Sequence, residues 1–210
     1  MKADKILFID TETGGIDPAS NSLLSLALVV WKELEVKASI EILIDDGVLN
    51  VTEKAMEING IDLGEHKKKA VTPAAALLQM DKFLNAHFQK DEKITLGGHN
   101  INFDVNFLNM FLIRNGYNFQ QRFSHRFVDT SSILFYLYLT GKLKRRLTAS
   151  QDAFDYFGVT VQGRHTARGD ALATAELFGK LVSILCRKSS GRSSAPKDMS
   201  DLFSPQNDIA

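Results

Sequence analysis

The chain has 210 residues, of which 44% are hydrophobic and 24% are charged. This length fits one folded domain with a short tail, and this composition predicts a soluble globular core. Twenty-five basic residues match twenty-five acidic ones, so the formal net charge is zero. A neutral chain argues against binding of nucleic acid by bulk charge alone. It leaves room for an acidic site with bound cations and local basic patches.

The sequence gives no sign of export or of a membrane segment. The first residues lead directly into an apolar run, without the apolar core or the cleavage site of a signal peptide. The longest nearly apolar run, residues 23–31, is too short for a bilayer, which needs about 20 residues. The single cysteine, Cys186, cannot form an internal disulfide and fits a reducing compartment. We therefore expect a cytoplasmic protein.

The first half of the chain predicts a sheet that opens as a meander. Residues 5–9 form a buried strand that runs into Asp10, and a turn follows at residues 14–18. Residues 22–31 and 35–44 predict two further strands joined tightly around residues 32–33. A helix should then begin at Thr72-Pro73, a cap residue followed by proline, and run to about Phe88.

The second half alternates predicted strands and helices. Residues 94–96 suit a short strand, and the next helix carries Phe103, Phe107 and Phe111 on one stripe, where the first two suit the core. Residues 127–128 predict the last strand, which leads into a helix after Asp129. Residues 148–151 resemble a capping box, and residues 171–185 hold helical spacing. The order predicts an α/β fold, a mixed sheet with helices against it.

The end of the chain differs in character from the rest. We expect a domain over residues 1–186 and a disordered polar tail over residues 187–210, because residues 189–196 have nothing to bury. Within this tail, Met199–Phe203 (MSDLF) looks somewhat like the short motif that docks on bacterial sliding clamps. The usual leading glutamine is replaced by methionine, and an idle tail is the alternative.

Asp10 and Glu12 lie two residues apart at the end of the first predicted strand. Side chains with this spacing point to the same face of a strand, so both carboxylates aim together where Gly14 and Gly15 open space. Like charges held side by side repel unless a cation lies between them, and hard divalent cations take oxygen ligands. The pair predicts a metal site, although an exposed acidic strand end explains it better in isolation.

The middle segment, HNINFD at residues 99–104, places Asp104 in the first turn of a helix. An acid there is favoured by the helix dipole without any catalytic role. Asn100 and Asn102 suit helix caps as well as substrate contacts, and His99 suits a packed or an exposed loop position.

His165 and Asp170 lie five residues apart, about 140° around a helix at 100° per residue. They share a site only if His165 lies in the loop before the helix and Asp170 in its first turns. Gly163 and Gly169 favour such an irregular start. The alternative for His165 is a surface histidine in a basic loop.

Taken together, the segments resemble the histidine-type DEDD exonucleases, the DnaQ-like family of the proofreading subunit of bacterial DNA polymerase III and of ribonuclease T. The matching stretches are residues 8–15 (FIDTETGG), 99–108 (HNINFDVNFL) and 165–171 (HTARGDA). Two further motifs of the family have counterparts at residues 55–61 (AMEINGI) and 127–130 (FVDT). The three main motifs in this order and spacing are highly specific.

The resemblance implies a ribonuclease H-like fold, a mixed sheet of five strands whose first three are antiparallel, flanked by helices. It also implies a two-metal 3′–5′ exonuclease that releases nucleoside 5′-monophosphates. Two Mg²⁺ or Mn²⁺ ions would be held by Asp10, Glu12, Asp104 and Asp170, and His165 would be the general base.

Substrate contacts and substrate class are less determined by the sequence. Asn100 and the backbone around Thr13 and Gly14 are candidates for positioning the terminal nucleotide. We expect DNA 3′ ends as the substrate, with trimming of RNA 3′ ends as an alternative, because recognition of the 2′-hydroxyl cannot be read locally. A catalytically silent module that binds nucleic acid or a replication partner is a further alternative. The basic cluster at residues 142–146 suits either phosphate contacts or a solvated loop.

The chain departs from the family at three positions. Ser25 stands where the family often has glutamate in the second strand. Ile16 and Ile58 stand where ribonuclease T has phenylalanines that stack on RNA bases, which weakens an assignment to that branch. Residues 59–62 (NGID) nevertheless look closest to ribonuclease T.

Overall fold

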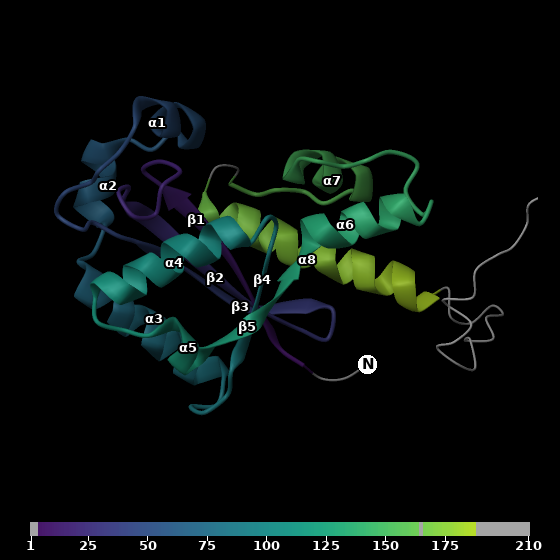
Figure 1. Ribbon diagram of the computed structural model, residues 1–210, viewed down its shortest axis with the longest axis horizontal. Coiled ribbons are helices and arrows are strands. Elements are labelled where there is room, and N and C mark those ends of the chain that lie inside the picture. Colours follow the sequence, from purple (N-terminus) through teal and green to yellow (C-terminus); the bar gives the residue numbers. More distant parts are fainter. Residues whose placement is uncertain (1–3, 164–165, 188–210) are drawn as a thin grey trace, which may run out of the picture.

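The computed structural model describes residues 4–163 and 166–187, and a five-stranded mixed sheet forms its centre (Figure 1). The strand order is β3-β2-β1-β4-β5. β1 (Ile6–Thr13), β2 (Leu23–Lys32) and β3 (Glu35–Leu43) pair antiparallel, whereas β4 (Ile94–Gly98) and β5 (Phe123–Asp129) add parallel to the other edge of β1. The predicted α/β fold with an antiparallel opening is confirmed.

Eight helices accompany the sheet in the described residues, and they cover both of its faces. They are α1 (Glu53–Asn59), α2 (Leu63–Lys69), α3 (Pro73–His87), α4 (Asn102–Arg114), α5 (Phe119–Arg122), α6 (Thr130–Leu139), α7 (Ser150–Phe157) and α8 (Ala167–Arg187).

β1 lies in the middle of the sheet because it is apolar on both faces. Leu7 and Ile9 belong to the larger core cluster, under α3 and α4, while Ile6 and Phe8 belong to a second cluster under α8. β1 is hydrogen-bonded to β2 along its length and to β4 at Leu7 and Phe8, so both of its edges are paired within the sheet. This position fixes the direction in which the residues beyond Ile9 point.

Helix α8 lies close to the sheet through a row of small side chains. Ala167, Ala171 and Ala175 pack against the cluster that contains Phe8 and Trp31. Their spacing of four residues places them on one face of the helix. A third cluster, made by α6, α7 and the outer side of α8, lies beyond the sheet.

Most predicted elements are confirmed, and the tight connection between β2 and β3 has a clear geometry. Glu33 and Leu34 both have positive φ angles, 56° and 69°, which a two-residue type I′ hairpin requires. Thr72 caps α3 by accepting a hydrogen bond from the Ala75 N–H, with Pro73 at the first helical position.

Two local predictions are wrong, and one of two alternatives for Asn100 and Asn102 is excluded. Helix α7 begins at Ser150 with Ala149 as its N-cap, and no side-chain cap bond is made, so the expected capping box is absent. Asn100 and Asn102 do not cap α4, whose N-cap is Ile101 without a side-chain bond. Phe107 is buried as expected, but Phe103 is 39% exposed, because the stripe of α4 rotates out of the core at its first turn.

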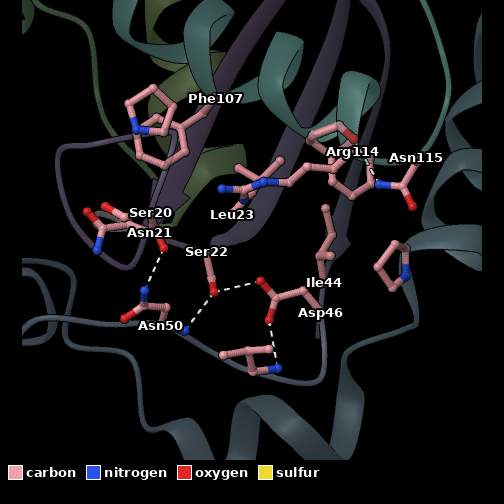
Figure 2. A pocket seen from close by; sticks show the side chains of 14 residues that line it. Ser20, Asn21, Ser22, Leu23, Ile44, Asp46, Asn50, Phe107, Arg114 and Asn115 are labelled. Carbon is pink, nitrogen blue, oxygen red and sulfur yellow. Dashed lines mark hydrogen bonds between the residues drawn. The ribbon is translucent and has the colours of Figure 1, made fainter.

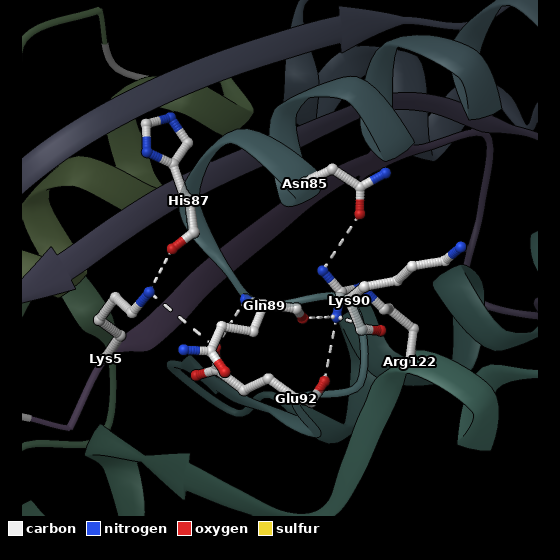
Figure 3. A network of polar contacts seen from close by, with 7 residues as sticks. All are labelled: Lys5, Asn85, His87, Gln89, Lys90, Glu92 and Arg122. Atoms are coloured by element: carbon white, nitrogen blue, oxygen red, sulfur yellow. Dashed lines mark hydrogen bonds and ion pairs between the residues drawn. The ribbon is translucent and has the colours of Figure 1, made fainter.

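The edge of the sheet where β1 begins is tied together by a polar network (Figure 3). Lys5 donates to the backbone carbonyl of His87 and forms an ion pair with Glu92 at 3.9 Å. Arg122 donates to the carbonyls of Lys90 and Glu92 at 3.2 and 3.1 Å. These bonds join β1, the turn after α3 and α5, and they stabilise the sheet at the end remote from Asp10.

Several predictions concern residues that the structure does not describe. His165, most of the predicted tail over residues 187–210 and the clamp-like motif Met199–Phe203 lie outside the described residues. Within the part that is described, every helix is too short or too polar to cross a bilayer. The cytoplasmic location stays a prediction.

Candidate metal centre and active site

The alternation of β1 carries its two acidic residues onto the face covered by α8. Ile6 and Phe8 contact the cluster under this helix, and Asp10 and Glu12 continue the same series of alternate positions. The register with β2 shifts between Glu12 and Thr13, which is a bulge at the end of the strand. Bulges are frequent beside active sites, where they change the direction of a side chain.

The third carboxylate comes from the other end of the chain. Asp170 lies in the first turn of α8, and each of Asp10, Glu12 and Asp170 offers an oxygen within 4.8 Å of the others. Gly169 allows the loop before α8 to lie against the first turn of the helix, since a Cβ there would lie 2.3 Å from the Gly163 carbonyl oxygen. The predicted convergence of these three residues is confirmed.

Asp104 approaches from α4, on the other side of the sheet. It is buried, and its Oδ1 accepts a hydrogen bond of 2.7 Å from the Thr11 hydroxyl. Thr11 points away from the Asp10 face because it alternates with it along β1. Burial raises the pKa of Asp104 to about 7, although the bonds from Thr11 act in the opposite direction.

Electrostatic repulsion dominates this cluster. Burial raises the pKa of Asp10 well above its ordinary value, and the neighbouring carboxylates raise it further, with Asp104 the strongest of them. Burial raises the pKa of Glu12 to about 7, assisted first by the charge of Asp170. Burial and mutual repulsion therefore act together on the carboxylates of Asp10, Glu12 and Asp104.

The residues fit a divalent metal. Hard cations such as Mg²⁺ and Mn²⁺ take carboxylate oxygens, and a bound cation removes the repulsion that raises these pKa values. Asp10, Glu12 and Asp170 form a compact oxygen set. Asp104 lies close enough to Asp10 to raise its pKa, on the opposite side of β1 from α8.

A pocket of about 450 Å³ opens directly beside the carboxylates. Its lining joins Glu12 and Thr13 of β1 to three exposed apolar side chains: Ile16, Ile58 and Phe103, which are 87%, 62% and 39% exposed. These three come from the loop after β1, from α1 and from α4. An apolar pocket next to a metal centre is suited to a flat organic group whose reacting atoms lie at the metals.

The loop after β1, which forms one wall of this pocket, is stabilised by hydrogen bonds outside the pocket. Figure 2 shows a second cavity, of about 360 Å³, where the Ser22 hydroxyl donates to Asp46 at 2.7 Å and accepts from the Asn50 N–H at 2.7 Å. Gly14 takes part as well, because its N–H donates to Ser22 and its carbonyl accepts from Thr52. The polar groups of this second cavity therefore fix the conformation of the loop.

A family comparison matches this geometry. The model of a family described as exonuclease matches residues 7–178, most of the chain. The chain belongs to this exonuclease family. The resemblance to histidine-type DEDD enzymes is thereby confirmed, and the chain is a 3′–5′ exonuclease, a hydrolase.

The relatives of this exonuclease include a protein of similar size, the 3′-5′ DNA exonuclease Cap18 of Escherichia coli. The two chains are 28% identical over 192 residues, which are 90% of this exonuclease and 97% of Cap18. This exonuclease is also 24% identical over 177 residues to the PolC-type DNA polymerase III of Pediococcus pentosaceus, of which it covers 11%.

Solved structures share the fold at lower identity. The zinc-bound complex of E. coli exonuclease I with single-stranded DNA has a TM-score of 0.76 at 18% identity and covers 88% of this exonuclease. The exonuclease spans only 42% of that chain. The nuclease domain of 3′hExo, a DEDDh family member bound to rAMP, has a TM-score of 0.72 at 16% identity, with 88% and 94% of the two chains covered.

The other predicted site residues have mixed surroundings. Asn100 is exposed, has a φ angle of 59°, and donates its N–H to Asp129. Thr13 is buried, and its hydroxyl donates to the Gly15 carbonyl at 2.7 Å. Gly14 uses both its N–H and its carbonyl in hydrogen bonds within the exonuclease. Nucleotide binding by Asn100, Thr13 and Gly14 stays a prediction.

Sequence reasoning missed one acid of the cluster. Glu41 on β3 lies in one row with Ala27 and Asp10 across three strands, and it raises the pKa of both Asp10 and Glu12. The Ser25 hydroxyl donates to Glu41 at 3.4 Å. The residue that the family often carries in the second strand is absent here, and a carboxylate from the neighbouring strand lies beside that position. The alternation of side chains along β3 was the available signal for Glu41. It could place this residue beside Asp10 only if the register between β1, β2 and β3 was known.

Proposed function

We propose that this exonuclease removes nucleotides one at a time from the 3′ end of single-stranded or frayed DNA by a two-metal mechanism. The observation that carries the proposal is the set of carboxylates from β1, α4 and α8, which repel one another unless cations are bound. Two Mg²⁺ or Mn²⁺ ions held by these carboxylates would supply stabilisation of the attacking and leaving oxygens in an in-line displacement.

Each acidic side chain has a position that suits one part of this task. Asp10 would be shared by both ions, since it lies between the α8 side and the α4 side of the cluster. Glu12 and Asp170 would complete one ion site, and Asp104 would serve the other. Thr11 holds Asp104 through its 2.7 Å hydrogen bond, which leaves the second carboxylate oxygen for a ligand.

His165 is proposed as the general base that takes the proton from the attacking water. Its unperturbed pKa of about 6.5 suits proton transfer near neutral pH. Support comes from its place in the sequence, five residues before Asp170, which lies in the first turn of α8. The neutral imidazole would accept this proton as the water oxygen bonds to phosphorus and the bond from phosphorus to the 3′ oxygen breaks. The leaving oxygen would take a proton from solvent, to which the imidazole later releases its own.

The pocket beside Glu12 would receive the terminal nucleotide. Its base would lie on Ile16, Ile58 and Phe103, and the scissile phosphate would then lie at the carboxylates. Aliphatic side chains make weaker stacking contacts than aromatic rings, so one ring and two isoleucines suit a site that accepts all bases.

DNA is the favoured substrate because the similarly sized relative is named a DNA exonuclease and exonuclease I is solved with single-stranded DNA. Trimming of RNA 3′ ends is the second candidate, favoured by the rAMP bound to the structural neighbour 3′hExo.

The test compares wild type with Asp10→Ala on 5′-labelled DNA and RNA strands of the same sequence, with Mg²⁺, with Mn²⁺ and with EDTA. We expect a ladder that shortens from the 3′ end of DNA, needs metal, and disappears in Asp10→Ala. Asp81→Ala, which removes an exposed acid on α3, is the control and should retain activity. Activity that survives in Asp10→Ala or in EDTA would refute the two-metal assignment. Faster digestion of RNA than of DNA would make RNA the favoured substrate.

A further inference from the structure

The outer face of α6 is apolar and aromatic where a surface helix is normally polar. Four neighbouring side chains on it are well exposed: Phe135 (41%), Tyr136 (59%), Tyr138 (38%) and Leu139 (65%). The other side of α6 packs into the third hydrophobic cluster, so the helix is fixed. A contiguous exposed group of this kind marks an interaction surface more often than isolated apolar residues do.

A basic loop follows directly and packs against this face. Leu143 and Leu147 are buried in the third cluster, and the cations between and before them are exposed. The guanidinium carbon of Arg146 lies 4.7 Å from the centroid of the Phe135 ring, which is a cation–π contact. The exposed cations are Lys142, Lys144, Arg145 and Arg146.

The charge of this surface is not balanced locally. No acidic residue occurs in the sequence between Asp129 and Asp152. Among the described residues, the ion pairs do not include any of the four cations of the loop. Aromatic rings beside uncompensated cations are the combination that binds single-stranded nucleic acid, because bases stack on the rings and phosphates meet the cations. An apolar protein partner would not require the cations.

The start of α6 is joined to the active site. The Asp129 carboxylate accepts from the Asn100 N–H at 2.9 Å, and the Thr130 hydroxyl lies 3.0 Å from His99 Nδ1, so α6 is anchored to the segment that leads to Asp104. α6 has 10 residues and is therefore about 15 Å long. α6 follows β5 at the edge of the sheet where β1 ends, because β1, β4 and β5 are parallel, and in Figure 1 α1 lies above the end of β1 and α6 to its right.

This arrangement gives the substrate strand a direction. The pocket proposed for the terminal nucleotide lies on the α1 side of the carboxylates, lined by Ile58 of that helix. A strand whose scissile phosphate lies at the carboxylates would continue away from this pocket. α6 begins at the same edge of the sheet, across β4 and β5 from β1, and its basic loop follows it.

We propose that the outer face of α6 and the loop over residues 140–146 bind the single-stranded nucleic acid upstream of the 3′ end. The proposal rests on the proposed function, since it names where that substrate lies outside the active site. It also explains how a chain with zero net charge holds a polyanion, by concentrating its cations on one surface.

The test uses two variants, Tyr136→Ala and the double variant Arg145→Glu/Arg146→Glu, with two substrates. A DNA trinucleotide reaches only the active site, whereas a strand of about 25 nucleotides also reaches α6. For each variant we expect KM for the long strand to rise about tenfold or more. We expect kcat and the cleavage of the trinucleotide to be unchanged. The double variant should also show a smaller salt dependence of binding, by roughly 0.7 in log–log slope for each lost phosphate contact.

The control is Lys67→Glu/Lys69→Glu on α2, which makes the same change of charge on the opposite side of the molecule. Fluorescence anisotropy of the long strand on Asp10→Ala, with and without the α6 substitutions, gives a readout independent of cleavage. An unchanged KM and unchanged anisotropy in both α6 variants would overturn this proposal while leaving the active site intact. A change of oligomeric state in light scattering, without a change of KM, would assign the surface to a second copy and overturn it too. Failure of wild type to cleave either substrate would overturn the proposed function and this proposal together.

Discussion

Replacing Asp104 by asparagine separates the stability of the metal centre from its activity. The change keeps the size of the side chain and the acceptor for the 2.7 Å bond from Thr11, and it removes one buried negative charge. Because burial raises the pKa of Asp104 from 3.8 to about 7 on folding, the native state holds this proton over a pH range in which the unfolded chain has lost it. The contribution of Asp104 to native stability therefore falls as pH rises through that window and is smallest above pH 7.

The size of the effect follows from the shift. A difference of about three pKa units corresponds to about 4 kcal/mol at 1.36 kcal/mol per unit, as an upper value for full ionisation without metal. Asparagine does not titrate, so Asp104→Asn should be as stable as wild type near pH 4 and more stable by up to this amount at pH 8. Its metal-dependent activity should fall by roughly a hundredfold or more.

Urea unfolding in EDTA at several pH values measures this directly. Asp46→Asn is the matched control, and its effect on stability at high pH should have the opposite sign. Burial opposes ionisation of Asp46, but the hydrogen bonds from Ser22 and from the N–H groups of Leu49 and Val48 outweigh it and lower its pKa. The stability that Asp46 contributes is present above its ordinary pKa and lost as pH falls, so Asp46→Asn should be less stable than wild type at pH 8. If Asp104→Asn shows the same difference from wild type at pH 4 and at pH 8, the electrostatic argument is wrong.

Three further changes test other parts of the site. Glu41→Gln removes a charge that raises the pKa of Asp10 and Glu12, so the pH midpoint of Mn²⁺-dependent activity should move to lower pH; an unmoved profile would exclude a role for this acid. Gly14→Ala would place a Cβ 2.2 Å from the Asn50 carbonyl oxygen, and we expect a loss of about 1–3 kcal/mol in thermal unfolding, which a well-tolerated variant would contradict. Thr130→Val removes the 3.0 Å bond to the buried Gly98 carbonyl and should cost about 1–3 kcal/mol, with Ser as the substitution that restores stability.

The sequence predicted the parts of this fold that depend on local pattern. The apolar runs gave β1, β2 and β3, and Thr72-Pro73 gave the start of α3, because burial and capping act through neighbouring residues. Helix α1 had its own signals, a cap at Thr52 and a left-handed glycine at Gly60, but its seven residues are too few for a periodic pattern.

The site was predictable where ligands follow motifs and not where they depend on register. Asp10, Glu12 and Asp170 converge as their order in the motifs implied. Glu41 could not be found in this way, since its place beside Asp10 depends on how three strands align. Phe103 was misplaced for a related reason, because helical spacing defines a stripe but not where the core ends along it.

The carboxylates that gather at the end of β1 come from both extremes of the folded region, with Asp10 and Glu12 near its start and Asp170 near its close. A ribosome releases the chain from its first residue onward, so a partly synthesised polypeptide lacks Asp170 until α8 has emerged. Under the proposed two-metal mechanism, such a polypeptide would have no complete metal centre and would not cleave nucleic acid.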